Sequence, residues 1–190
     1  MKTLHDFTTT VPAWKPHVAP LDLAKATVAQ LDALKVTPSN QKVSDYVLVL
    51  AHDVETLKVR TPLFNAIMYN RGGLSRAERE LGAVSSSVVN RCIYCAAVHA
   101  SRYNQLAREG TTIAEIFARG ANAKLEPRLA AIFNFATRLS QSPPTADSAD
   151  IAALVDAGLN PDEILDLVLS TSLFGWANRL MHTLGEPIEA

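Results

Sequence analysis

Apolar residues recur every three or four positions along most of the chain, which is the spacing of helices with one buried face. Strand-like alternation is nearly absent, and Ala and Leu dominate the periodic segments. Breaks at Pro, Gly and Asn give the approximate ends of each segment. The pattern predicts an all-α fold with helices over residues 21–34, 44–58, 62–70, 75–89, 92–108, 111–120, 126–141, 149–158 and 160–185.

Two of these helices have well-marked starts. Ser75 and Glu78 form a capping box, in which each side chain can satisfy an otherwise unpaired amide of the first turn. Asn160 can cap the last helix in a similar way, and Pro161 fits its first position. The Pro-Pro pair at 143–144 cannot continue the helix before it.

The first 19 residues differ from the rest of the chain. Prolines at 12, 16 and 20 beside Trp14 predict an extended arm rather than a helix. A length of 190 residues is typical of one domain. We therefore expect an arm over residues 1–19 and a single-domain helical bundle over 20–190. The arm would lie over its own core or over a neighbouring subunit.

Composition narrows the classes of partner. The chain is 48% hydrophobic and 19% charged, with a formal net charge of -1. It has no basic block, so we expect neither a nucleic-acid partner nor an anionic membrane partner. No apolar stretch approaches the roughly 20 residues that span a bilayer, and the start lacks the features of a signal peptide. A cytoplasmic location is the resulting expectation. In that compartment two thiols indicate chemistry or metal binding more often than a structural disulfide.

Both cysteines of the chain lie in the stretch NRCIYCAAVH, residues 90–99. At about 100° per residue, Cys95 and His99 lie within about 60° of Cys92 on one helix face. Cys92 falls at the predicted helix start, where the helix dipole and the neighbouring Arg91 should both lower the pKa of its thiol. Thiols, an imidazole and a helix N-terminus therefore converge on one patch.

Glu80 is the proposed fourth member of this patch. If a turn at residues 90–91 closes a helical hairpin, Glu80 and His99 each lie about 15 Å from the turn, on facing helices. A carboxylate there can orient the imidazole and accept a proton, which gives a relay from Glu80 through His99 to Cys95.

Three other interpretations are open at this point. Cys92, Cys95 and His99 could supply three zinc ligands, with His52, His182 or Glu80 as the fourth. The same residues could be inert members of a core in a structural interaction module. A third possibility is an acid–base enzyme on a small organic acid that uses Glu80 and His99 without the cysteines. From the chemistry alone, redox is favoured over zinc because no second ligand pair occurs at finger-like spacing.

The segment ELGAVSSSVVNRCIYCAAVHASR resembles the alkylhydroperoxidase D-like (carboxymuconolactone decarboxylase) family, especially its peroxidase-related branch. The resemblance is clearest over residues 74–102, and the redox core would extend over about 74–108. It implies an all-helical fold that assembles into trimers, hexamers or other homo-oligomers. It also implies a peroxidase or disulfide reductase in antioxidant defence, in which Cys95 attacks the peroxide, Cys92 resolves it, and Glu80 and His99 relay protons.

One position departs from the family pattern. Tyr94 stands where the best-studied members carry a histidine, and a phenol with a pKa near 10 is a poor base at neutral pH. Turnover of peroxide could therefore be slower, or a partner protein's disulfide could be the substrate. No metal or cofactor is expected, so electrons must come from an external dithiol such as a lipoyl or thioredoxin-like donor.

Overall fold

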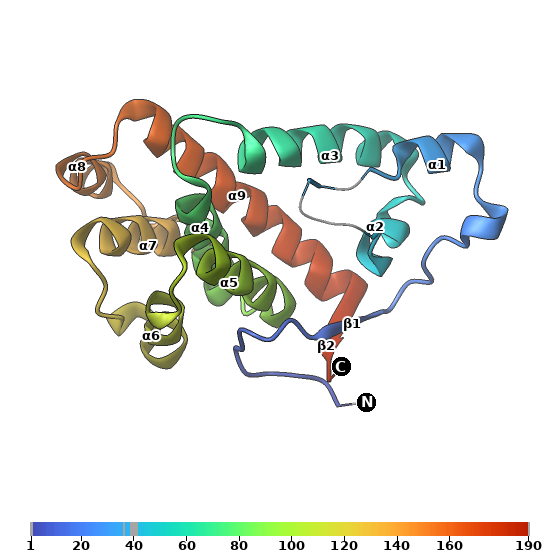
Figure 1. The fold of residues 1–190 in the computed structure, drawn as a ribbon, viewed down its shortest axis with the longest axis horizontal. Coiled ribbons are helices and arrows are strands. Elements are labelled where there is room, and N and C mark those ends of the chain that lie inside the picture. Colours follow the sequence, from blue (N-terminus) through green and yellow to red (C-terminus); the bar gives the residue numbers. More distant parts are fainter. Residues whose placement is uncertain (1, 36, 39–41, 190) are drawn as a thin grey trace.

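The computed structural model describes residues 2–35, 37–38 and 42–189. Over these residues the secondary structure is mainly α-helical, as the sequence predicts, with two short strands and two 3-10 turns (Figure 1). The α-helices are α1 (Val28–Ala33), α2 (Asp45–Leu50), α3 (Val54–Tyr69), α4 (Arg76–Val89), α5 (Ile93–Ala107), α6 (Thr111–Arg119), α7 (Pro127–Leu139), α8 (Ser148–Asp156) and α9 (Pro161–Leu184). The 3-10 turns are η1 (Leu23–Lys25) and η2 (Gly120–Asn122).

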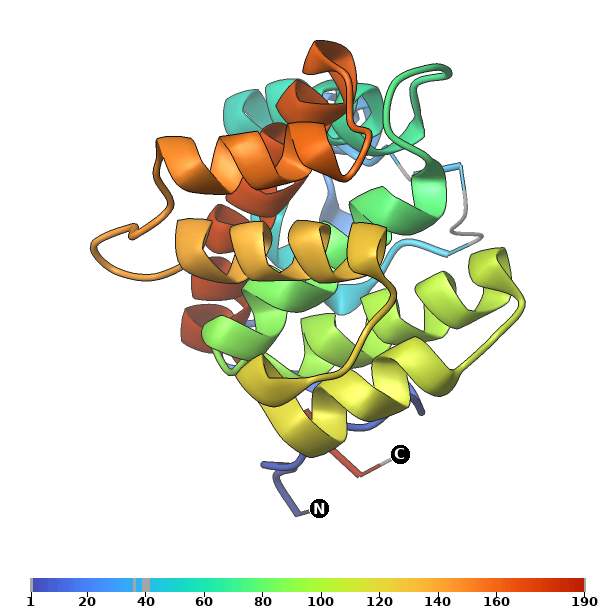
Figure 2. The ribbon, with the colours of Figure 1, turned by 90° about the vertical axis from the view of Figure 1, so that its left-hand side faces the viewer.

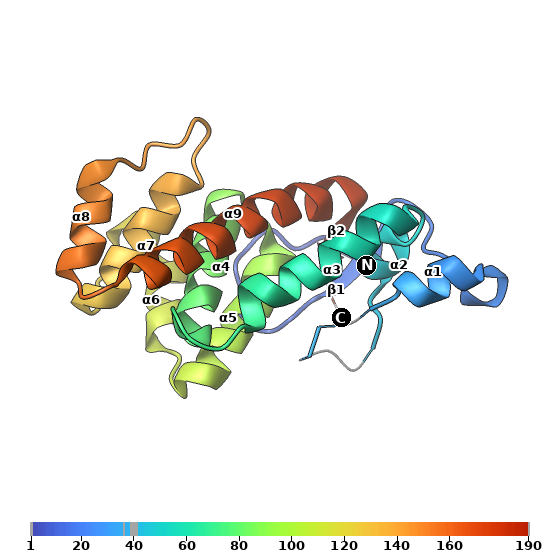
Figure 3. The same cartoon turned by 90° about the horizontal axis from the view of Figure 1, so that it is seen from above.

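The long helix α9 organises the molecule. It crosses the fold diagonally and packs against α3, α4 and α7, while α4 and α5 form a hairpin at the centre (Figure 1). Seen from above, α6, α7 and α8 form one end of the molecule, and α1 and α2 form the other (Figure 3). Figure 2 shows the first end, where α7 and α8 lie side by side. None of the described helices is both long enough and apolar enough to cross a bilayer.

The main hydrophobic core lies between α4, α5, α6, α7, α8 and α9, where burial of apolar side chains is the principal stabilising term. Its fully buried members include Leu81, Ile113, Ile132, Leu154 and Leu167, one from each of five of these helices. The apolar stripes predicted from the sequence therefore meet in one continuous core.

Arg128 ties the starts of two helices together. The capping box predicted at the start of α4 and the Asn160 cap predicted at the start of α9 are both present, and Asn160 forms a capping box with Glu163. Arg128 of α7 binds the carboxylate of Glu78 at 2.6 Å and that of Glu163 at 2.8 Å. The same glutamates thus cap their own helices and fix them to a third.

Several predicted boundaries in the N-terminal third are wrong. The helix expected over 44–58 is interrupted at residues 51–53, because Asp53 caps a new helix by accepting a hydrogen bond from the Thr56 backbone N–H. Pro62 does not begin a helix but lies within α3, on its solvent-exposed side. Water can bind the backbone carbonyl that proline leaves without a donor there. The helix expected over 21–34 is reduced to η1 and α1 because Thr27 forms a capping box with Gln30.

The N-terminal arm contributes a strand that the sequence pattern does not predict. Strand β1 (Ala13–Pro16) pairs antiparallel with β2 (Gly185–Ile188), which follows α9 directly. The indole of Trp14 occupies the space next to Gly185, where a Cβ atom would lie only 2.3 Å from the ring. The arm therefore lies against the C-terminal end of its own chain, and both termini meet there (Figure 1).

We expect Gly73→Ala to lower the free energy of unfolding by about 2–4 kcal/mol. Gly73 has a left-handed φ of +62°, and an added Cβ would lie 2.0 Å from the carboxylate of Asp166. That carboxylate binds the buried guanidinium of Arg79 at 2.6 Å, so displacing it leaves a buried charge without its partner. Gly72→Ala is the matched control, because Gly72 also has a positive φ (+85°) but has open space around it. Chemical denaturation should show a loss of only about 1–2 kcal/mol for the control, and equal losses would contradict the prediction.

Candidate active site

A tight connection between α4 and α5 places Cys92 at a helix start. Arg91 adopts a left-handed conformation with φ of 54°. The Arg91 N–H donates to the Val88 carbonyl at 3.1 Å, and the Cys92 N–H donates to the Ser87 carbonyl at 2.9 Å. These two hydrogen bonds end α4 in a Schellman motif. Cys92 is therefore the last residue of that motif and also the N-cap of α5.

Both thiols are free and buried in the same small cluster. Cys92 is 3% exposed and Cys95 is 6% exposed, and both contact Met181 of α9. The aromatic rings of Trp14, Tyr46 and Tyr94 pack against this cluster, so the N-terminal arm helps to cover it. The pair is thus screened from bulk solvent.

The two sulfur atoms interact with each other, and this interaction separates their pKa values. Hydrogen bonding from the Cys95 thiol lowers the pKa of Cys92 against the opposing effect of burial, and the Cys95 backbone N–H lowers it further. The same pairing with Cys92, together with burial, raises the pKa of Cys95 well above its ordinary value. Such a pair loses its first proton readily and its second with difficulty, and the negative charge rests mainly on Cys92.

The direction predicted for the pKa of Cys92 agrees with this arrangement, but Arg91 is not among the groups that lower it. The Arg91 guanidinium lies 5.3 Å from the centre of the Phe7 ring, and it donates a hydrogen bond to the His5 carbonyl at 3.3 Å. The Arg91 side chain is therefore engaged with residues of the arm. The amide at the helix start and the neighbouring thiol lower the pKa of Cys92 instead.

Glu80 and His99 face each other across the hairpin. His99 Nδ1 lies 2.5 Å from Glu80 Oε2, and Glu80 is only 1% exposed. With Nδ1 donating to the carboxylate, the neutral imidazole carries its lone pair on Nε2. The His99 ring also packs edge-on against Phe174 of α9, with 4.1 Å between ring centres. The imidazole is therefore held in one orientation from two sides.

Arg76 is a member of this site that the sequence analysis missed. Its guanidinium binds the other oxygen of Glu80 and the backbone carbonyl of Met68, and it lies 3.9 Å from the centre of the Tyr69 ring. Glu80 thus has two cationic or hydrogen-bonding partners. The signal that could have indicated Arg76 is its i, i+4 spacing to Glu80.

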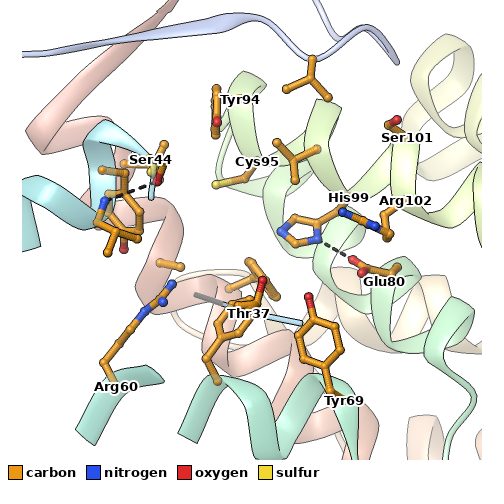
Figure 4. Close-up of a pocket in the computed structure, with 18 of the residues that line it drawn as sticks. Thr37, Ser44, Arg60, Tyr69, Glu80, Tyr94, Cys95, His99, Ser101 and Arg102 are labelled. Atoms are coloured by element: carbon orange, nitrogen blue, oxygen red, sulfur yellow. Dashed lines mark hydrogen bonds and ion pairs between the residues drawn. The ribbon is translucent and has the colours of Figure 1, made fainter. Parts of the chain in front are cut away.

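Two cavities meet at the thiol pair. The larger, of about 360 Å³, is lined by Cys95, His99 and Glu80, and Figure 4 shows these side chains around one space. The smaller, of about 280 Å³, is lined by Cys92 together with residues of the arm and of β2. Tyr94 lines both cavities, and burial followed by the charge of Cys95 raises the pKa of its phenol. Tyr94 therefore keeps its proton at neutral pH and can act only as a hydrogen-bond donor or acceptor there.

The structure does not assemble the zinc ligand set considered from the sequence. Among the described residues, no group of three or more His, Cys, Asp or Glu side chains is arranged to hold a metal ion. His52 binds the Ala19 carbonyl at 2.9 Å, and His182 binds the Asn90 carbonyl at 2.8 Å. Neither histidine is available as the fourth ligand.

Asn178 is a second residue that the sequence analysis missed. It is fully buried on α9, where its side-chain amide lies within hydrogen-bond distance of Ser86, Ser87 and Asn90. The same amide adjoins both thiols. A buried Asn in an otherwise apolar helix face is a possible sequence signal, but only packing shows that it lies beneath the cysteines.

We expect Cys92 to ionise at lower pH than an ordinary thiol and therefore to hold a larger thiolate fraction at neutral pH. Cys95→Ala removes the largest cause of this shift, so the Cys92 pKa should rise. Cys95→Ser keeps a hydroxyl donor and should raise it less. The pKa of Cys92 in all three proteins can be measured from the ultraviolet absorbance of the thiolate as a function of pH. A lower titration midpoint in Cys95→Ala than in the unmodified protein would contradict the interpretation.

The fold and the site together define an all-helical protein with a paired-thiol centre beside a buried carboxylate–imidazole pair. The sequence model of the Carboxymuconolactone decarboxylase family matches residues 55–138. This match extends from α3 to α7, and its range includes every predicted site residue. No curated protein matches the chain.

Solved structures support the same relationship. A peroxidase-related protein from Ralstonia eutropha JMP134 with an alkylhydroperoxidase AhpD core is 25% identical, with a TM-score of 0.76 over 89% of this chain and 90% of the other. A peroxidase-related protein from Silicibacter sp. TM1040 is 26% identical, with a TM-score of 0.73 over 90% and 92%. The debrominase Bmp8 is 16% identical, with a TM-score of 0.73 over 93% and 94%, which shows a shared fold. The family match and these structures together support assignment of the chain to the alkylhydroperoxidase D-like (carboxymuconolactone decarboxylase) family, and they indicate an enzyme of this kind.

Proposed function

We propose that this chain is a thiol-dependent peroxidase or disulfide oxidoreductase that works through Cys92 and Cys95 in antioxidant defence. One observation supports the proposal most directly. Cys95 opens into the same cavity as the Glu80–His99 pair, and Cys92 interacts with Cys95 from the other side. A nucleophile, a proton carrier and a resolving thiol therefore meet at one point.

Cys95 is the proposed peroxide-reacting residue. Its thiolate attacks the outer oxygen of a hydroperoxide, the O–O bond breaks, and the sulfur is oxidised to a sulfenic acid. The departing alkoxide takes a proton and leaves as an alcohol. His99 is placed to relay that proton, because Nδ1 stays bound to Glu80 while Nε2 first accepts the proton released by the thiol pair and then passes it to the alkoxide.

The distribution of charge within the thiol pair is compatible with this role. Cys92 carries most of the negative charge of the singly ionised pair, so Cys95 must pass its proton to Cys92 before it attacks. The two sulfurs already interact, and the proton crosses only that one contact. The larger cavity brings a peroxide to Cys95 and not to Cys92, which favours Cys95 despite its raised pKa.

Cys92 is the proposed resolving residue. Once its proton has passed to the alkoxide, the Cys92 thiolate attacks the sulfenic sulfur of Cys95, a disulfide forms, and the hydroxyl leaves as water after taking a proton from solvent. An external dithiol then donates two electrons and two protons, which restores both thiols and leaves the donor as a disulfide. The identity of that donor as a lipoyl or thioredoxin-like dithiol remains a prediction, as does assembly into a homo-oligomer.

A single labelling experiment tests the proposed function. The reduced protein is treated with one equivalent of hydroperoxide, with a sulfenic-acid trapping reagent present, and is analysed by mass spectrometry. The expected result is a Cys92–Cys95 disulfide in the unmodified protein and a trapped sulfenic acid on Cys95 in Cys92→Ser. If neither thiol is modified, or if activity on any substrate survives replacement of both cysteines, the thiol mechanism fails.

A further inference from the structure

The larger cavity has an excess of positive charge that the proposed reaction does not use. Glu80 is the only carboxylate among the described residues that line it, and Arg76 and His99 already bind that carboxylate. The remaining cationic side chains in the described lining are Lys35, Lys42, Arg60 and Arg102. A cavity lined by one sign of charge attracts ligands of the opposite sign.

Arg60 of α3 is the best placed of these cations. Its guanidinium lies 4.7 Å from the centre of the Phe64 ring and 5.8 Å from that of Tyr46, so two aromatic rings fix its position. Figure 4 shows it reaching into the cavity from α3, across from the helix that carries Cys95 and His99. Its position is therefore opposite the reacting groups, within the same space.

Arg60 has no anionic partner in the part of the chain that the structure describes. None of the ion pairs within 4 Å among the described residues includes Arg60, and its Nε atom is buried without a hydrogen-bond partner. The hydroxyl oxygen of Tyr46 is also buried; it interacts with the Arg60 guanidinium, and no acceptor for its O–H is found among the described residues. Burial raises the pKa of Tyr46 to about 12, against the opposing charge of Arg60, so the phenol stays a hydrogen-bond donor.

A cation without an anion and a phenol O–H without an acceptor raise the free energy of the folded state, and a bound ligand that pairs with both would lower it. Arg60 is partly buried, and a cation partly removed from water destabilises the fold when no anion compensates it. Guanidinium groups bind carboxylates through two parallel hydrogen bonds, and a nearby phenol can donate a third. The missing component is therefore a planar anion with two acceptor oxygens.

We propose that the larger cavity binds an organic hydroperoxide that carries a carboxylate, with Arg60 and Tyr46 holding the carboxylate while the peroxide group faces Cys95. The inference rests on the proposed peroxidase function and adds the substrate class. A volume of about 360 Å³ suits a small organic acid, because it lies at the lower end of the range for small-molecule sites. Apolar lining residues such as Phe64, Phe174 and Met181 would contact the carbon chain between the two ends.

A matched pair of substrates tests the inference. A short aliphatic hydroperoxide with a terminal carboxylate is compared with its methyl ester, which has the same peroxide group and no charge. We expect kcat/KM of the unmodified protein to be at least about tenfold higher for the acid, since charge-assisted hydrogen bonds are lost with the ester. Most of the difference should be in KM, because the carboxylate binds equally in the ground state and the transition state.

Variants of Arg60 assign the effect to this residue. Arg60→Gln should reduce the acid-to-ester ratio to about one, and Arg60→Lys should give an intermediate ratio because it keeps the charge but not the planar fork. Arg102→Gln is the comparison, since Arg102 lines the same cavity without the two-ring setting, and its ratio should stay close to that of the unmodified protein. An unchanged ratio in Arg60→Gln, or a ratio near one in the unmodified protein, overturns the inference.

The failure of the inference can be distinguished from failure of the proposed function. If both hydroperoxides are reduced at equal rates, the peroxidase proposal stands and the carboxylate site does not. If neither is reduced and neither thiol is oxidised, the peroxidase proposal itself fails. If Arg60→Gln does not fold, a competition experiment with the unmodified protein replaces it. The corresponding carboxylate without a peroxide group should inhibit reduction of the hydroperoxide acid, and the methyl ester of that carboxylate should not. Equal inhibition by acid and ester would overturn the inference.

Discussion

Cys95→Ser is expected to lower kcat/KM for hydroperoxide reduction by at least about 1,000-fold. A serine hydroxyl at this position has no neighbouring base that could ionise it as readily as the paired thiol. Cys92→Ser should also stop steady-state turnover, because a sulfenic acid on Cys95 would have no thiol to resolve it. It should nevertheless consume about one equivalent of peroxide per chain.

Stopped-flow measurement of peroxide consumption separates the two cysteine variants. Cys92→Ser should show one rapid turnover, and Cys95→Ser should show none. The buried serines of α4 offer a matched control. Ser85→Cys introduces no thiol into either cavity and should retain full activity, since Ser85 bonds only to the Leu81 carbonyl within its own helix. A rapid single turnover in Cys95→Ser would instead make Cys92 the peroxide-reacting residue.

Glu80→Gln is expected to reduce both stability and rate. The substitution keeps the shape of the side chain but removes the negative charge that faces Arg76 and His99. Breaking this buried group of charges should lower the free energy of unfolding by about 2–4 kcal/mol. Loss of the orienting carboxylate should reduce kcat by about 10–100-fold, since the imidazole is then held less firmly in its productive tautomer.

Glu78→Gln is the control for this prediction. Glu78 lies on the same helix and pairs with Arg128, but it does not line either cavity. Chemical denaturation should show a loss of stability for both variants, whereas the pH profile of kcat should change only in Glu80→Gln. If kcat of Glu80→Gln stays within twofold of the kcat of the unmodified protein, the proposed proton relay from Glu80 through His99 is wrong.

The sequence was most informative where function depends on one stretch of chain. Cys92, Cys95 and His99 belong to a single turn-and-helix segment, so helical periodicity alone places them on one face. Glu80 could be placed opposite His99 because the hairpin has a short connection and helices have a fixed rise. The resemblance to the family rested on these same four residues.

The predicted helix boundaries failed where local signals compete. The start of α3 is set by Asp53, whose capping hydrogen bond outweighs the continuous apolar stripe that favours one long helix over 44–58. Pro62 is compatible with a helix interior because its face of α3 is exposed. Neither outcome follows from periodicity, since both depend on which side of the helix meets solvent.

By itself, the sequence determined the helical class, the capped starts of α4 and α9, and the common face of the two thiols and the imidazole, because each depends on residues only a few positions apart. The tertiary structure alone decided what surrounds that face. Packing of α2, α3 and α9 brings Tyr46, Arg60 and Asn178 to the thiols from positions up to about 130 residues apart in the chain. The arm adds Trp14 by pairing with β2. These contacts depend on the relative placement of distant helices, which local spacing does not encode.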